Sequence, residues 1–90
     1  MRTGTTSTGF KFKVKDETLD NMELVDALGD SDNENEAPLA MSRICKLLLG
    51  DDKKKLYDHV RAEDGRVPAE AIGKEITEIF QLMGEEGKNL

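Results

Sequence analysis

The stretch that decides the fold is PLAMSRICKLLLG, from Pro38 to Gly50. Its apolar side chains occupy most of the circumference of a helix, so neighbouring elements must cover the helix on more than one side. Proline fits the first helical turn, where its missing N–H would have no partner, and Gly50 can adopt the left-handed conformation that closes a helix. The stretch therefore predicts a central helix over 38–49.

Acidic residues are concentrated just before this helix, because residues 16–36 carry many acids and no base. Within this segment apolar residues recur at helical spacing: Leu19, Met22, Val25 and Leu28. This pattern and a stop at Gly29 predict a short amphipathic helix over 18–28. Residues 30–36 are polar and lack periodicity, so we expect a surface loop there.

Two more helices are predicted after Gly50. Asp51 is a good N-cap for a helix over 52–63, whose apolar face is Leu56, Tyr57 and Val60. The sequence Gly-Arg-Val-Pro at 65–68 then leads into a last helix that ends near Gly84. The apolar stripe of this helix is Ala69, Ile72, Ile76, Ile79, Phe80 and Met83.

The N-terminal segment has two parts with different patterns. Residues 10–15 alternate apolar and basic side chains, which predicts a half-buried edge strand with its lysines facing water. Such a strand needs a pairing partner, and residues 66–67, its own N-terminal tail and another subunit are all open at this point. Residues 1–9 are small and polar, so we expect them to form a mobile tail.

The fold class that follows is mainly α-helical, a small bundle of about four short helices with a short N-terminal β-strand. Ninety residues are enough for one modest core, so we expect a single helical domain over 10–84. Residues 85–90 should fray.

Composition narrows the class of partner. The chain has a formal net charge of −6, with 36% charged and 37% hydrophobic residues, as in a soluble acidic domain. An acidic chain repels phosphate backbones, so a protein is expected as partner rather than nucleic acid. The lone cysteine, the polar N-terminus and the lack of a long apolar stretch predict a cytoplasmic protein outside the membrane.

The residue types needed for catalysis are scarce. His59 is the only histidine and Cys45 the only cysteine, so neither a catalytic triad nor a zinc site can be assembled. Cys45 lies in the apolar stretch and is interpreted as a small buried hydrophobe. A calcium loop starting at Asp30 fails, because its sixth and twelfth positions are Asn35 and Met41. We therefore expect no enzyme activity, cofactor or metal.

Two groups of residues are candidates for binding a partner. The acids of the surface loop are either simply solvated or form a docking site for a basic partner: Asp30, Asp32, Glu34 and Glu36. Three apolar residues are either core or part of an interface: Leu48, Ile76 and Phe80. Short helices leave part of the central helix uncovered, so self-association of the chain is also open.

The order of these elements resembles the small tail assembly chaperones of long-tailed bacteriophages. The matching residues are Phe10 to Lys15, Leu47 to Gly50, Leu56 and Val60, Gly65 to Pro68, and Ile72 to Phe80. The resemblance implies a protein without an active site that binds the tape measure protein and recruits tail tube subunits. It also implies a location in the cytoplasm of the bacterial host and absence from the mature virion.

Two rival classes remain at the level of sequence. One is an acidic regulatory protein or DNA mimic, in which the acids of 16–36 imitate phosphates and inhibit a basic partner. The clustering of these acids in one third of the chain disfavours a mimic, which should spread them along an extended face. The other is a DNA-binding protein, which requires Lys11, Lys13 and Lys15 to converge in space with Lys53–Lys55.

Overall fold

The computed structural model describes residues 1–88, and these are mostly helical with a short antiparallel sheet at the N-terminus. In chain order the elements are β1 (Arg2–Thr5), β2 (Lys11–Val14), α1 (Asp16–Leu19), α2 (Met22–Asp30), α3 (Ala37–Leu49), the 3-10 helix η1 (Gly50–Asp52), α4 (Lys53–Val60) and α5 (Ala69–Lys88). A mainly α-helical chain with an N-terminal β element is therefore confirmed. The arrangement is a β-hairpin packed on helices rather than a simple helical bundle.

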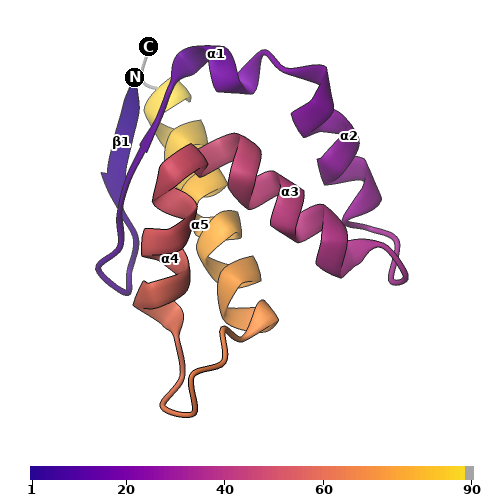
Figure 1. Cartoon of the computed structure of the whole chain (residues 1–90). Coiled ribbons are helices and arrows are strands. Elements are labelled where there is room, and N and C mark those ends of the chain that lie inside the picture. The colour runs from indigo at the N-terminus through magenta and orange to yellow at the C-terminus, as the bar shows by residue number, and fades with distance from the viewer. Residues whose placement is uncertain (89–90) are drawn as a thin grey trace.

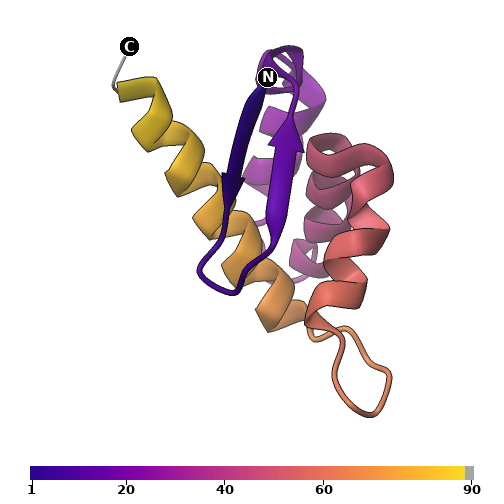
Figure 2. The ribbon, with the colours of Figure 1, turned by 90° about the vertical axis from the view of Figure 1, so that its left-hand side faces the viewer.

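The elements form two layers around one core. The β-hairpin lies across α5 on one side of the molecule, and α3 and α4 lie beside it (Figures 1 and 2). α2 packs along α3 as a helical hairpin at the other side (Figure 1). The core contains apolar side chains from β2 and the residue before it, and from α2, α3, α4 and α5: Phe10, Phe12, Val14, Leu24, Ala27, Ile44, Cys45, Leu48, Leu49, Leu56, Ile72, Ile76, Ile79 and Met83.

The central position predicted for the apolar stretch is confirmed. α3 runs over Ala37–Leu49 with Pro38 in its first turn, and Gly50 follows with φ of 56°. It contacts α2, α4, α5 and β2, so its neighbours cover it on several sides. Leu39 is the exception, because its side chain stays exposed near the start of the helix.

The prediction of a mobile tail over 1–9 is wrong. Residues 2–5 form β1, which pairs antiparallel with β2, so the strand finds its partner in its own N-terminal segment. Thr6 N–H donates to Phe10 C=O at 2.9 Å and Gly9, at φ of 92°, completes the turn. Backbone pairing needs no apolar side chains, which is why the polar composition of this segment was misleading.

A glycine in β1 makes room for the core side of the hairpin. Gly4 lies opposite Phe12 in the ladder, and a Cβ at Gly4 would approach the Phe12 ring to 2.7 Å. Phe12 is buried, so its ring has little freedom to move away. The aromatic ring therefore occupies the space that a side chain on β1 would need.

The predicted helix over 18–28 is divided into α1 and α2. The break falls at Asp20 and Asn21, where the Asn21 side chain accepts a hydrogen bond from Glu23 N–H at 3.0 Å and so caps α2. Asparagine favours such a cap over the interior of a helix. The new start also changes the buried face of the helix to Leu24 and Ala27, so Met22 and Val25 are exposed.

The ends of the last two helices also differ from the prediction. α4 ends at Val60 instead of 63, because residues 61–66 form a turn closed by Ala62 N–H donating to Arg66 C=O at 2.8 Å. Asp51 lies in η1 and does not cap α4. α5 continues to Lys88 rather than ending near Gly84. Of the frayed end predicted over 85–90, residues 85–88 belong to this helix, and residues 89–90 lie outside the described residues.

Candidate partner-binding surfaces

The acidic residues singled out in the sequence lie at the turn between α2 and α3. Asp30 ends α2 and accepts a hydrogen bond from the Arg43 guanidinium on α3. Asp32, Glu34 and Glu36 are exposed. The turn holds its own shape, since Asn33 N–H donates to Asp30 C=O and Glu36 N–H donates to Asn33 C=O, each at 3.0 Å. Solvated acids at a defined turn are thus available to a partner.

The three apolar candidates differ in their exposure. Leu48 and Ile76 are each only 3% exposed, and both belong to the core. Phe80 is partly buried against the same core. In this conformation Leu48 and Ile76 therefore offer almost no surface, and the apolar surface for a partner must be found elsewhere.

That surface is carried by residues that the sequence patterns placed on buried faces. Leu39 is 74% exposed, Met22 69% and Val25 50%, and all three lie on the α2–α3 hairpin. Met22 and Val25 are exposed because α2 buries the face that carries Leu24 and Ala27. Leu39 lies between the exposed Pro38 and the buried Ala40 in the first turn of α3, and the apolar pattern alone does not separate it from its buried neighbour.

Leu39 and part of the acidic turn share one surface hollow. A depression of about 510 Å³ is lined by Asp30, Glu36, Leu39, Ser42 and Arg43, and we call it the Leu39 hollow. It brings together two of the predicted acids and the most exposed large apolar side chain. An exposed leucine flanked by carboxylates suits a partner segment with apolar and basic side chains.

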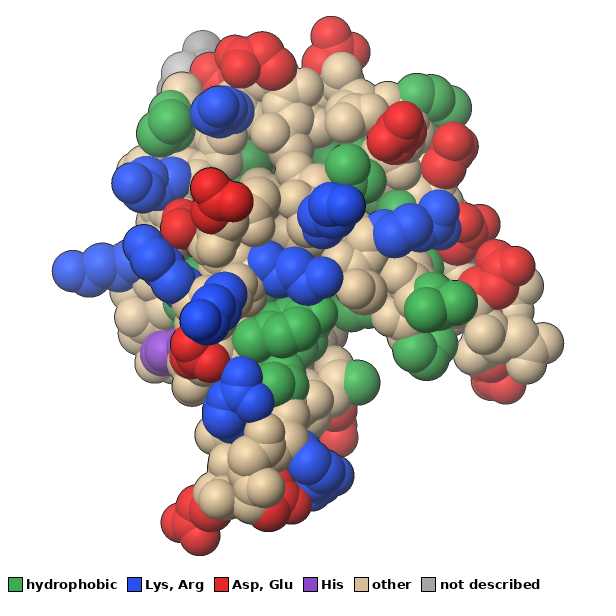
Figure 3. Space-filling model, viewed as in Figure 1, with side chains coloured by type: hydrophobic (Ala, Val, Ile, Leu, Met, Phe, Trp, Pro, Cys, Tyr) green, Lys and Arg blue, Asp and Glu red, His purple; other side chains and the backbone are tan. Residues whose placement is uncertain are grey.

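Basic side chains gather on another part of the surface. Figure 3 shows lysine and arginine side chains spread over the face formed by α3 and α4, with a few acids between them. Lys13 and Lys15 line a cleft together with Asp51 and Asp52, which directly precede Lys53–Lys55. The cleft thus places two carboxylates beside Lys13 and Lys15, and none of Lys53–Lys55 lines it.

A buried carboxylate ties the hairpin turn to α5. Glu75 is 3% exposed, and its Oε1 accepts hydrogen bonds from the hydroxyls of Thr6 at 2.8 Å and Thr8 at 2.9 Å. Since the Thr8 hydroxyl hydrogen is used in this way, His59 Nε2 is assigned as the donor in its 3.1 Å contact with Thr8 Oγ1. Glu75, Thr6, Thr8 and His59 therefore form one hydrogen-bonded cluster between the hairpin turn, α4 and α5.

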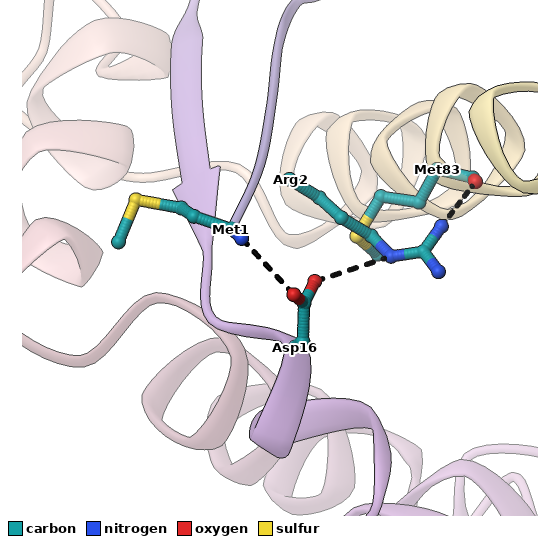
Figure 4. A network of polar contacts seen from close by, with 4 residues as sticks. All are labelled: Met1, Arg2, Asp16 and Met83. Atoms are coloured by element: carbon teal, nitrogen blue, oxygen red, sulfur yellow. Dashed lines mark hydrogen bonds and ion pairs between the residues drawn. The ribbon is translucent and has the colours of Figure 1, made fainter.

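A second polar cluster ties β1 to α1 and α5 (Figure 4). The Met1 amino group donates to Asp16 Oδ2 at 3.0 Å, and Arg2 Nη1 donates to Met83 C=O at 2.9 Å. Arg2 Nε is buried, and Asp16 Oδ1 lies 3.7 Å away, close enough for charge attraction but not for a hydrogen bond. These contacts hold the open end of the hairpin against α1 and α5.

The described residues contain no group of histidine, cysteine and acidic side chains that could hold a metal ion. Cys45 is buried, and burial raises the pKa of its thiol, which the positive charge of Lys53 offsets only in part. The thiol is therefore held in its unreactive protonated form.

Comparisons of the chain with family models, with curated proteins and with solved structures found no match. None of the helices in the described part of the chain is long and apolar enough to cross a membrane.

Proposed function

We propose that the chain is a tail assembly chaperone of a long-tailed bacteriophage or prophage. In this role it binds the tape measure protein and recruits tail tube subunits by non-covalent contacts, in the cytoplasm of the bacterial host, and is absent from the mature virion. The proposal starts from the resemblance in the order of elements. The observation that carries it is the Leu39 hollow, where a large exposed apolar side chain lies beside the Glu36 carboxylate and the Asp30–Arg43 ion pair.

This surface has the properties that a chaperone of a long helical client needs. An apolar side chain that stays in water on a folded domain gains free energy when a client covers it, about 1.5–3 kcal/mol for a fully buried leucine. A single such contact supports a weak complex, which tube polymerisation can displace. The exposed Glu36 carboxylate favours clients with a basic residue next to the apolar ones, since Asp30 is already paired with Arg43.

The two rival classes are less well supported. A DNA mimic needs its acids on one extended face, whereas Asp30 is paired with Arg43 and the other loop acids cluster at one turn. A DNA-binding protein needs the two lysine groups to converge, whereas the cleft beside Lys13 and Lys15 is lined by Asp51 and Asp52. These acids and the net charge of −6 oppose a phosphate backbone.

The test is co-purification of the full chain with the tape measure protein encoded beside its gene. We expect the chain to retain the tape measure protein in a pull-down at moderate salt. Binding of duplex DNA by the chain, without binding of the tape measure protein, would overturn the proposal.

A pair of variants locates the surface. Leu39→Ser removes the exposed apolar side chain in the hollow, and Val25→Ser removes one outside it. Both side chains are largely exposed, so both variants should fold. We expect Leu39→Ser to weaken the complex about tenfold, the equivalent of about 1.4 kcal/mol, while the Val25→Ser control binds as the parent does.

A further inference from the structure

The two edges of the β-hairpin are not equivalent. The outer side of β1 lies next to α5, and the two are joined by the Arg2 hydrogen bond to Met83 C=O and by Ser7 N–H donating to the Glu78 carboxylate (Figure 2). β2 contacts α3, but among the described residues no strand pairs with its outer side and no hydrogen bond outside the ladder uses the backbone of Lys11 or Lys13. β2 therefore carries the open edge.

The register identifies the backbone groups that this edge presents. In an antiparallel ladder, pairs that exchange hydrogen bonds alternate with pairs that do not. Thr6 N–H bonds Phe10 C=O, so the next bonded pairs are Gly4 with Phe12 and Arg2 with Val14. The N–H and C=O groups of Lys11 and Lys13 then point away from β1, towards the open edge.

A cleft lies beside the end of this strand. It has a volume of about 480 Å³ and is lined by Met1, Lys13, Lys15, Thr18, Leu47, Leu48, Leu49, Gly50, Asp51 and Asp52. Such a volume is typical of binding clefts rather than of packing defects. The wall from α3 is formed by the half-buried Leu47 and the buried Leu48 and Leu49, and the wall from β2 is basic. The remaining carboxylates lie on η1, where Asp52 is already paired with Lys55 at 3.4 Å.

The lysines decide what kind of strand can pair here. Lys11, Lys13 and Lys15 all point to the solvent side of the sheet, and cross-strand neighbours on that side would lie beside them. A second β2 would place lysines against lysines, which disfavours pairing of two copies. The acidic turn of a second copy is not extended, because its own backbone hydrogen bonds hold it.

We propose that the open edge of β2 and its cleft bind an extended peptide segment that alternates acidic and apolar residues, as a third strand of the sheet. The acidic side chains lie beside the lysines and the apolar ones face the half-buried Leu47, while the peptide backbone bonds the free groups of Lys11 and Lys13. This site is separate from the Leu39 hollow and does not depend on the identity of the client.

The experiment uses a fluorescent peptide, Glu-Val-Glu-Val-Glu-Val-Glu, titrated with the full chain and followed by anisotropy. We expect saturable binding that weakens as salt is raised. Two matched probes separate the contributions: the same peptide with every backbone nitrogen methylated, and a Lys-Val peptide of equal length. Both should bind at least about tenfold more weakly, because one lacks N–H donors and the other is repelled.

Variants of the chain locate the binding site. Lys13→Pro removes an N–H at the open edge, Lys13→Thr removes only the charge, and Thr3→Pro makes the matched change at the covered edge. We expect the peptide affinity to fall most for Lys13→Pro, less for Lys13→Thr and not at all for a folded Thr3→Pro.

Three results would overturn the proposal. One is equal binding of the methylated and unmethylated peptides, which needs no variant to fold. Another is equal binding by the parent chain and Lys13→Thr. The third is displacement of the peptide by duplex DNA together with tight DNA binding, which would make the lysines a phosphate-binding surface.

Discussion

The hairpin–α5 junction and the α2–α3 turn use charged and polar residues in opposite ways. At the junction, the Glu75 carboxylate is buried and its oxygen accepts from two threonine hydroxyls. At the turn, Asp32, Glu34 and Glu36 remain in water, and Glu36 shares a surface hollow with the exposed Leu39. The polar groups of the junction therefore stabilise the fold, whereas the exposed acids of the turn remain available to a partner.

The largest effect is expected where α3 enters the core. Leu48→Asp places an unpaired carboxylate at a position that is 3% exposed, which should cost about 4 kcal/mol or more and unfold the domain. Circular dichroism and urea denaturation measure this loss. If the variant stays folded and loses only binding or self-association, Leu48 belongs to an interface and not to the core.

A smaller effect is expected at the junction. Glu75→Ala leaves the buried Thr6 hydroxyl without its acceptor, which should lower the free energy of unfolding by about 2–3 kcal/mol. Glu75→Gln keeps an acceptor oxygen and should lose less than half as much. Urea denaturation of both variants tests this ranking, and wild-type stability in Glu75→Ala would show that the junction does not depend on this group.

The Asn21 cap at the start of α2 should contribute about 1 kcal/mol to the free energy of unfolding. Asn21→Ala removes the oxygen that accepts from Glu23 N–H, a typical N-cap loss. Asn21→Asp is the matched control, because aspartate caps equally well. Urea denaturation with equal stability for Asn21→Ala and Asn21→Asp would mean that the break between α1 and α2 has another cause.

The smallest effect on the free energy of unfolding is expected at the exposed side chain of Leu39. Leu39→Ser should change the free energy of unfolding by less than about 0.5 kcal/mol, because the side chain is 74% exposed. A clear loss in thermal or urea denaturation would show that Leu39 supports the fold, and it could then not be assigned to partner binding alone.

The elements that the sequence predicts best are those with one dominant signal. α3 has a proline at its start, a glycine at its end and apolar residues between them, and its bounds agree with the prediction within one residue at its start. The β2 strand likewise follows from strict alternation of lysines with Phe10, Phe12 and Val14. In both cases burial of side chains and local backbone preference favour the same structure.

The errors arise where the backbone or a capping side chain decides the structure. β1 contains no large apolar residue, and its order depends on pairing and on contacts of residues 6–8 with α5 that are distant in sequence. Asn21 divides one apolar pattern into two helices and turns Val25 outward. The Leu39 hollow was missed for a related reason, because the apolar pattern does not show where neighbouring elements end.

Hydrogen–deuterium exchange of the full chain, alone and bound to the tape measure protein, tests most directly whether the client binds at the Leu39 hollow. We predict that binding slows exchange over residues 30–43, which contain the acidic turn and the Leu39 hollow, and leaves exchange in the buried junction of residues 72–79 unchanged. Unchanged exchange over 30–43 in a saturated complex would contradict it.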